Sequence, residues 1–191
     1  MHVERYCIIL IFLLFYTNIA RSQKQRTEIS INFRTNSIVI DSTYSDNAAR
    51  MRGIITTLQN IKQDSTVNIV EVSFCGAASP EGSYELNRKL ARGRLTSLEK
   101  FVRRDIDIPD STRNDSYIPW DYLKSQVENS DLQNKDEIIF ILEEEARLVD
   151  YHHTGTNIDN RIVKLKQLDN GKVWQQMNKL FFGQMRNLPY A

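Results

Sequence analysis

The sequence predicts a mixed α/β fold (α+β), in which a β-α-β-α core with its sheet covered by helices precedes a mostly helical second half. Three patterns support this prediction. Apolar residues alternate within Glu28–Asp41 and run almost unbroken through Val67–Gly76, as in strands. A stretch with apolar residues at helical spacing follows each of these segments. After Arg104 helical spacing predominates, and the chain length fits one domain with its own core.

The first residues of the chain have the organisation of a secretory signal peptide. Arg5 precedes an apolar run over Tyr6–Tyr16, and the small-residue site Ala20-Arg21-Ser22 ends the segment. The apolar run is shorter than the roughly 20 residues that a membrane-spanning helix needs. We therefore expect Met1–Ser22 to be removed and an exported chain to begin at Gln23.

Charge and cysteine content exclude some classes of function. The chain has 25 Lys and Arg against 24 Asp and Glu, and the basic residues are scattered. Bulk charge therefore gives no reason to expect a nucleic-acid partner. Cys75 is the only cysteine beyond the leader, so no intramolecular disulfide is predicted. Its place at the end of an apolar strand predicts a small buried side chain.

The first half is expected to alternate strands and helices. The Glu28–Asp41 strand bends or bulges at Thr35-Asn36-Ser37, where its alternation breaks. Ser45 is expected to cap a helix that extends to about Gln63. Val67–Gly76 then forms an inner strand, buried on both faces because its apolar residues are nearly continuous.

A second helix, expected from Ser83 to Arg104, carries two polar residues within its apolar face. Asn87 and Arg94 are two turns apart and therefore lie one above the other. The apolar residues of this face are Leu86, Leu90, Leu98, Phe101 and Val102. An unpaired buried charge costs several kcal/mol, so Arg94 needs a partner. Two interpretations remain open: an internal carboxylate or carbonyl group, or the carboxylate of a ligand near the helix start.

The second half, residues 105–191, is expected to be a helical elaboration of the same domain. The polar stretch Asp107–Ser116 comes nearest to a boundary, and Tyr117-Ile118-Pro119 indicates a short strand. Helical spacing then predicts a helix with Trp120, Leu123 and Val127, a second over Asn134–Val149, a third from near Arg161 to Asp169-Asn170-Gly171, and a last with Val173 to Met185. Either Leu188–Ala191 supplies a stub of a final strand, or that strand is missing.

Residues between the second strand and the helix after it resemble a known family. They are Gly76, Gly82-Ser83, Asn87, Leu90 and Arg94. At these spacings they are similar to the core of the OmpA-like periplasmic domain, the module that tethers outer-membrane proteins to peptidoglycan. The resemblance covers residues 28–104, and the loop and the sequence after the helix look more like the divergent members from the Bacteroidetes than the enterobacterial form.

In that family a loop aspartate and a helix arginine hold the amino and carboxylate groups of diaminopimelate in the stem peptide. The resemblance implies that Arg94 holds a stem-peptide carboxylate and that Asn87 positions the loop. Ser79 stands where the family has its aspartate, which is a departure from the pattern. The binding site would then be lined by Ser79, by Glu81 as the nearest negative charge, and by backbone N–H groups from Gly82 onward.

The resemblance predicts an exported, non-enzymatic binding domain without cofactor or metal, in the periplasm and associated with the cell envelope or outer membrane. Its expected partner is peptidoglycan, bound noncovalently. An alternative keeps the fold but makes the chain a protein-interaction or structural module of an outer-membrane or surface-appendage system that has lost wall binding. An open Arg94 guanidinium favours the first function, and one already paired with Glu81 or another carboxylate favours the second.

Other chemistries are not favoured by the sequence. His152 and His153 are adjacent, so they point to different sides of the chain, and no third metal ligand stands at a usual spacing. Ser79 lacks the G-x-S-x-G surroundings of a nucleophile elbow. The run Glu143-Glu144-Glu145 is typical of a solvated helix surface. Exposed loop histidines and no enzymatic activity are therefore expected.

Overall fold

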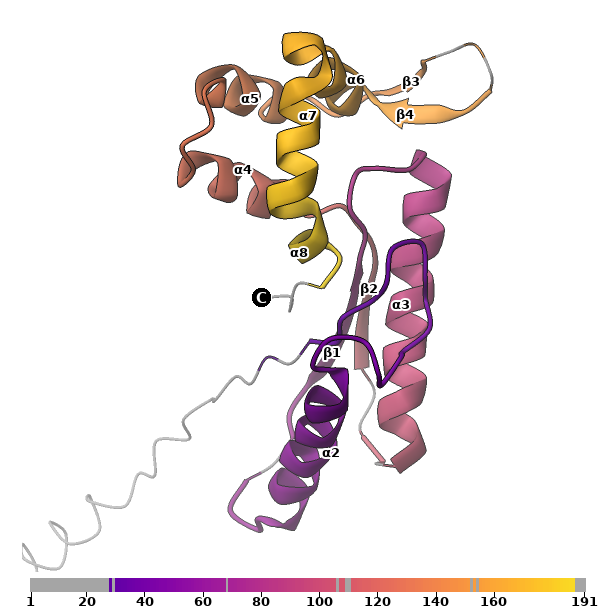
Figure 1. Cartoon of the computed structure of the whole chain (residues 1–191). Coiled ribbons are helices and arrows are strands. Elements are labelled where there is room, and N and C mark those ends of the chain that lie inside the picture. The colour runs from indigo at the N-terminus through magenta and orange to yellow at the C-terminus, as the bar shows by residue number, and fades with distance from the viewer. Residues whose placement is uncertain are drawn as a thin grey trace, which may run out of the picture.

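A computed structural model describes residues 28, 30–67, 69–105, 107–108, 111–151, 153 and 155–187, with the side chains of 111–117 excepted (Figure 1). The predicted signal peptide and the predicted strand stub at Leu188–Ala191 lie outside the described residues. Among the helices that are described, none is long and apolar enough to cross a membrane.

The described chain is a mixture of helices and two small sheets, which confirms the α+β class. The elements of the first half are α2 (Asn47–Gln63), β1 (Val72–Ala77), α3 (Tyr84–Asp105) and β2 (Ser111–Tyr117). Those of the second half are α4 (Trp120–Glu128), α5 (Lys135–Leu142), β3 (Leu148–Asp150), β4 (Asn157–Asp159), α6 (Asn160–Gln167), η1 (Leu168–Gly171), α7 (Lys172–Met177), η2 (Asn178–Phe182) and α8 (Gly183–Met185). Figure 1 shows the second half gathered at one end of the sheet made by β1 and β2.

The first sheet is a parallel pair, with Val72 of β1 opposite Ser111 of β2. Parallel neighbours need a long crossover connection, and α3 supplies it while lying along the pair (Figure 1). The polar stretch Asp107–Ser116 is therefore no boundary, because most of it belongs to β2. The short strand predicted at Tyr117-Ile118-Pro119 is not a separate element, because β2 ends at Tyr117. Backbone pairing with β1 decides the conformation here, whatever the polarity of the side chains.

The strand predicted over Glu28–Asp41 does not form within residues 30–41. Its alternation nevertheless identifies the inward side chains, because Ile31 and Phe33 are buried at 3% and 5% exposure. The predicted bend at residues 35–37 is also confirmed, as a turn. The N–H groups of Asn32 and Phe33 donate to side-chain oxygens of α2 and of the C-terminal segment, so they are paired without a neighbouring strand.

Two further predictions for the first half need correction. The second strand begins at Val72 and not at Val67, and Val70 is 77% exposed, so the segment is not an inner strand buried on both faces. The described residues give its sheet only two strands. Helix α2 agrees with the prediction, but Ser45 is not its cap. Ser45 has a left-handed φ of 53°, and Asp46 occupies the cap position.

The buried face of α3 is displaced from the one that the leucine pattern predicts. Leu86 is 40% exposed, whereas Ala91 and Leu95 are fully buried. Because Ala91 is small, the helix lies very close to β1 at Gly76. A Cβ atom on that glycine would stand 1.8 Å from the carbonyl oxygen of Ala91. Glycine is therefore required at this crossing by the packing, independently of any ligand.

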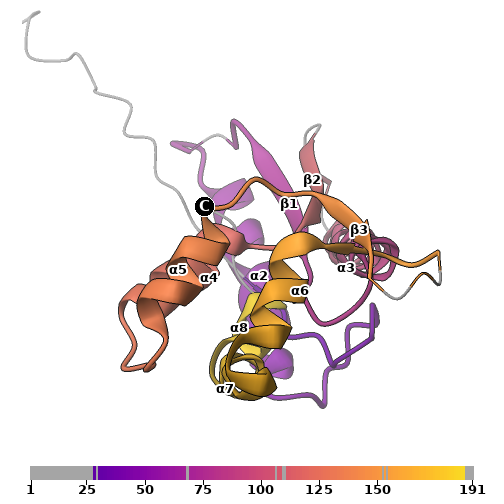
Figure 2. The ribbon, with the colours of Figure 1, turned by 90° about the horizontal axis from the view of Figure 1, so that it is seen from above.

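The helices of the second half are largely those predicted, with one early ending. Helix α5 stops at Leu142, and Leu148–Asp150 forms strand β3, which pairs antiparallel with β4. Negative charges at a helix C-terminus oppose the helix dipole, which explains why Glu143-Glu144-Glu145 does not continue α5. Glu143 and Glu145 are exposed as predicted, and Glu144 is half-buried. Figure 2 shows α4 and α5 on one side of this half and β3 on the other.

The two halves have separate hydrophobic cores. The first comprises Ile31, Phe33, Ile54, Phe74, Leu95, Val102 and Ile108. The second comprises Leu123, Val127, Ile138, Ile141, Leu142, Leu165, Val173, Met177, Phe181, Phe182 and Met185. Because no buried apolar residue belongs to both groups, the polar contacts between the halves gain importance. Those contacts centre on the loop between β1 and α3.

Candidate functional site

The five predicted site residues lie in the loop after β1 and on the first turns of α3. Ser79, Asn87 and Arg94 are buried, at 6%, 4% and 1% exposure, and Glu81 and Gly82 are half-buried. A tight loop joins the buried end of β1 to the start of α3, so these side chains gather into one polar cluster. The prediction that Asn87 and Arg94 lie within the apolar face of the helix is thereby confirmed.

Asn87 fastens the loop to the helix that follows it. Its side-chain Nδ2 donates to the carbonyl oxygen of Gly82 at 3.2 Å. A Cβ atom on Gly82 would stand 2.8 Å from the Asn87 Oδ1 atom, so this approach favours glycine in the loop. At the helix start, the Ser83 hydroxyl accepts from the backbone N–H of Leu86 at 3.2 Å. These bonds set the direction in which the loop leaves β1.

Arg94 is paired with main-chain carbonyl groups. Its Nη1 donates to Ala77 O at 2.8 Å, its Nε to Ser37 O at 3.0 Å and its Nη2 to Arg34 O at 3.4 Å. The guanidinium also lies 5.5 Å from the centre of the Phe33 ring. Arg94 thus ties the end of β1 to the N-terminal segment. Of the two interpretations of Arg94, the geometry matches the internal one, through carbonyls.

Burial is the main cause of an unusual pKa at Arg94. Burial and, to a lesser extent, the positive charge of Arg186 lower the pKa of the guanidinium, and the negative charge of Glu81 opposes them, so that the pKa is about 10. Arg94 therefore remains charged at neutral pH. A buried guanidinium group that stays protonated loses its hydration, and hydrogen bonds to its N–H groups must compensate for that loss.

Glu81 is paired with the C-terminal segment and not with Arg94. Its Oε2 accepts from Arg186 Nη1 at 2.7 Å and from the Ser79 hydroxyl, and its Oε1 accepts from Asn178 Nδ2 at 3.1 Å. The same Nη1 of Arg186 lies 3.3 Å from Ser79 Oγ. Both carboxylate oxygens are thus engaged by side chains far away in the sequence.

The residue after Arg186 makes a second connection to the first half. Asn187 Oδ1 accepts from the backbone N–H of Phe33 at 2.8 Å, and Asn187 Nδ2 donates to Gly183 O at 3.1 Å. We call Asn178, Arg186 and Asn187 together the C-terminal clasp. Through the clasp the last helical stretch is joined to the loop and to the N-terminal segment.

Sequence reasoning missed all three residues of the clasp. Each is a polar residue in or just after the last helical stretch, separated by 97 residues or more from its partner in the first half. The one available signal was Glu81, a loop carboxylate next to a predicted buried strand, which would need a cation if it were buried. With 25 Lys and Arg scattered along the chain, that need selects no particular partner.

A buried ion pair lies within the helical half. Arg161 Nη2 donates to Asp159 Oδ2 at 2.7 Å, and the guanidinium stands 4.3 Å from the centre of the Trp120 ring. Asp159 also caps α6 by accepting from the Arg161 N–H at 2.9 Å. Both charges find their partners within this half, so the pair joins α4 to α6 and leaves no group directed at a ligand.

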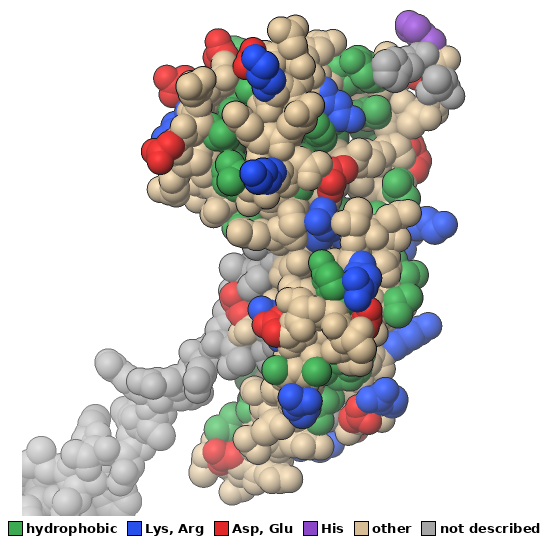
Figure 3. All heavy atoms as spheres, in the orientation of Figure 1, with side chains coloured by type: hydrophobic (Ala, Val, Ile, Leu, Met, Phe, Trp, Pro, Cys, Tyr) green, Lys and Arg blue, Asp and Glu red, His purple; other side chains and the backbone are tan. Residues whose placement is uncertain are grey.

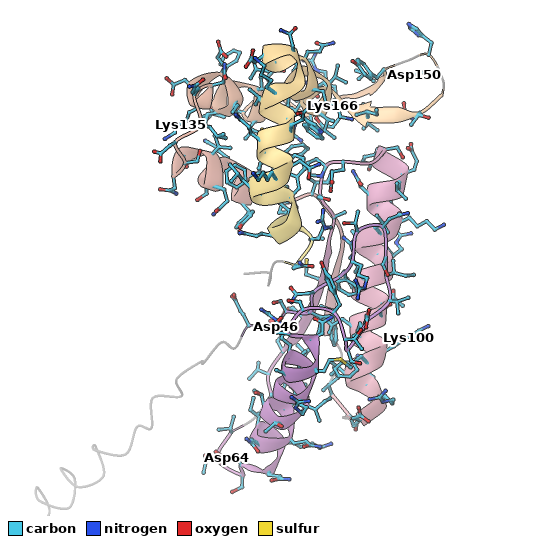
Figure 4. All side chains as sticks on the ribbon, in the orientation of Figure 1. Asp46, Asp64, Lys100, Lys135, Asp150 and Lys166 are labelled. Carbon is cyan, nitrogen blue, oxygen red and sulfur yellow. The ribbon has the colours of Figure 1, made fainter. Side chains whose placement is uncertain are left out.

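Metal ligands and histidines were the other candidate groups of the sequence. The described residues contain no group of three His, Cys, Asp or Glu side chains that could hold a metal ion. His153 is exposed, and His152 lies outside the described residues. Figure 3 shows acidic and basic side chains interspersed on the face it presents, and in Figure 4 Lys100 projects from α3 away from the sheet.

The thiol of Cys75 on β1 gives a test of this packing. Burial raises its pKa to about 11, so little thiolate is present at pH 8. We expect the chain from Gln23 to Ala191 to react with an aromatic disulfide reagent roughly a hundredfold more slowly when folded than when unfolded. Absorbance of the released thiolate, followed with and without denaturant, measures both rates. Cys75 is half-buried and not the fully buried side chain that the sequence predicts. Equal rates would contradict even this partial burial.

Comparison with known proteins found no matching family model, curated protein or solved structure. The resemblance to the OmpA-like periplasmic domain therefore stays a prediction from the sequence. The function proposed below therefore rests on the geometry of the polar cluster.

Proposed function

We propose that the chain is an exported, non-enzymatic module with a structural or protein-interaction role in an outer-membrane or surface-appendage system. In this proposal the polar cluster joins the two halves of the domain and does not bind the cell wall. The observation that carries it is the state of Arg94, which is 1% exposed and donates to three main-chain carbonyls. Main-chain carbonyls are one of the two kinds of internal partner that the sequence allows for Arg94.

A wall ligand would have to displace the carbonyl groups that already accept hydrogen bonds from Arg94. A stem-peptide carboxylate that took Arg94 would leave the carbonyls of Ala77 and Ser37 without their donor. Each buried group left unpaired costs about 1–3 kcal/mol. Glu81 is likewise engaged, because its carboxylate already neutralises Arg186. Internal pairing therefore competes directly with any wall ligand at this site.

Noncovalent peptidoglycan association is the second candidate function. It is favoured by the convergence of the residues that the resemblance implies, since Ser79, Glu81, Gly82, Asn87 and Arg94 occupy one loop and one helix. A cation already stands beside Glu81, where an amino group of a stem peptide would pair. Under this function the clasp has to release Glu81 before the wall is bound.

Cosedimentation with purified diaminopimelate-type sacculi separates the two functions. We expect the chain from Gln23 to Ala191 to remain in the supernatant, because Arg94 and Glu81 are both engaged. An OmpA-like domain that has the loop aspartate serves as the positive control. Pelleting of the wild-type chain, lost in a folded Glu81→Gln variant and kept in Glu85→Gln on the exposed turn of α3, would overturn the structural role in favour of wall binding.

A further inference from the structure

Glu81 and its neighbours form a cation-binding site within the polar cluster. Glu81 Oε2 and Ser79 Oγ both lie within hydrogen-bonding distance of one nitrogen, Arg186 Nη1, at 2.7 and 3.3 Å. Asn178 holds the other carboxylate oxygen at 3.1 Å. A carboxylate and a hydroxyl that converge on one N–H donor form a site suited to an ammonium or a guanidinium group.

The site does not pair all of the hydrogen-bond donors of Arg186. Only Nη1 reaches Glu81, so the pair lacks the two parallel bonds of a bidentate arginine–carboxylate contact. The Nε atom of Arg186 is buried and has no hydrogen-bond partner among the residues that the structure describes. The positive charges of Arg94 and Arg186 repel each other, and after burial this repulsion is the second cause of the lowered pKa of Arg94. The arginine therefore occupies the site with part of its donor capacity unused.

We infer that Arg186 is an intramolecular ligand, which closes the cation-binding site of Glu81, Ser79 and Asn178 to amines and guanidinium groups from outside. A compact ammonium from outside can donate to the same two acceptors, Glu81 Oε2 and Ser79 Oγ. Such a ligand would replace Arg186 and loosen the C-terminal clasp at the same time. This goes beyond the proposed function, because it makes the joint between the halves responsive to a ligand.

The first test removes the Arg186 side chain and supplies a small cation from solution in its place. In Arg186→Ala the site loses its internal ligand, and we expect ethylguanidinium or ethylammonium to raise the melting temperature by about 3–6 °C at ten times the dissociation constant. The double variant Arg186→Ala/Glu81→Gln is the matched control, because it lacks the carboxylate. Ethylurea, which has a similar shape and no charge, should have no effect. An equal response of the single and double variants to the cations would overturn the inference.

The second test uses the wild-type chain and does not depend on the folding of a variant. The buried Nε–Hε group of the half-buried Arg186 should give a ¹⁵N–¹H signal distinct from those of exposed arginines. Titration with ethylammonium should move this signal toward the exposed arginines, together with the side-chain amide signal of Asn178. The signal of Arg161, which is paired with Asp159, should stay in place. An Arg186 signal that moves no more than that of Arg161 would show that the site does not exchange its ligand.

Discussion

Replacement of Gly76 by alanine should cost about 3 kcal/mol or more of the free energy of unfolding, or prevent folding altogether. The added Cβ atom would lie 1.8 Å from Ala91 O and 2.7 Å from Ala91 C, both backbone atoms of α3. Neither atom can move aside alone, so the helix would have to withdraw from β1. Chemical denaturation followed by circular dichroism measures the loss.

A second glycine provides a matched control for this substitution. Gly53 lies inside α2, and a Cβ atom there would meet nothing within 4 Å. We expect Gly53→Ala to stabilise the chain by about 0.5–1 kcal/mol, because alanine loses less conformational freedom than glycine in a helix. If Gly76→Ala proved as stable as Gly53→Ala, the close crossing of α3 over β1 would be wrong.

Replacement of Arg94 by methionine should destabilise the fold by about 3–5 kcal/mol. Methionine fills similar space but leaves Ala77 O and Ser37 O without donors inside the protein. Arg94→Lys should also be destabilising, because one ammonium group cannot reproduce the planar fork that reaches separate carbonyls. Urea unfolding curves of the two variants and the wild type give the differences.

Arg88 on the exposed side of α3 is the control for Arg94. It is the same residue type, less than two turns earlier in the helix, and its side chain is exposed. We expect Arg88→Met to change the free energy of unfolding by no more than about 0.5 kcal/mol. If Arg94→Met were equally mild, the carbonyl contacts of Arg94 would contribute little to stability. The structural role of the polar cluster would then lose its main support.

Periodicity in the sequence predicted the helices better than the strands. Helix α3 was expected over Ser83–Arg104 and runs one residue later at each end, because its apolar positions repeat over six turns. For Ile31 and Phe33 the alternation predicted burial correctly, but it carries no information on which backbone groups pair. Those partners come from α2 and from Asn187, which local spacing does not reveal.

In the candidate site, too, the sequence predicted which residues are buried but not which groups they pair with. The positions of Asn87 and Arg94 within the apolar face followed from helix geometry alone, and both are buried. Their partners did not follow, because a buried arginine can be satisfied equally by a carboxylate, a ligand or a carbonyl. The resemblance directed attention to Glu81, but its pairing with Arg186 spans 105 residues. Distances of that kind are set by the tertiary fold.

The C-terminal clasp also affects the order in which the protein is assembled. Phe33 and Asn187 are 154 residues apart, so the N–H of Phe33 has no access to this partner until nearly all of the described chain has been synthesised. Contacts within the helical half, such as that of Arg161 with Asp159, join near neighbours and can form as soon as that part of the chain has been made. Closure of the clasp is therefore expected to be the last step of folding. An emerging chain would keep its N-terminal segment incompletely paired, and open to other proteins, for most of its synthesis.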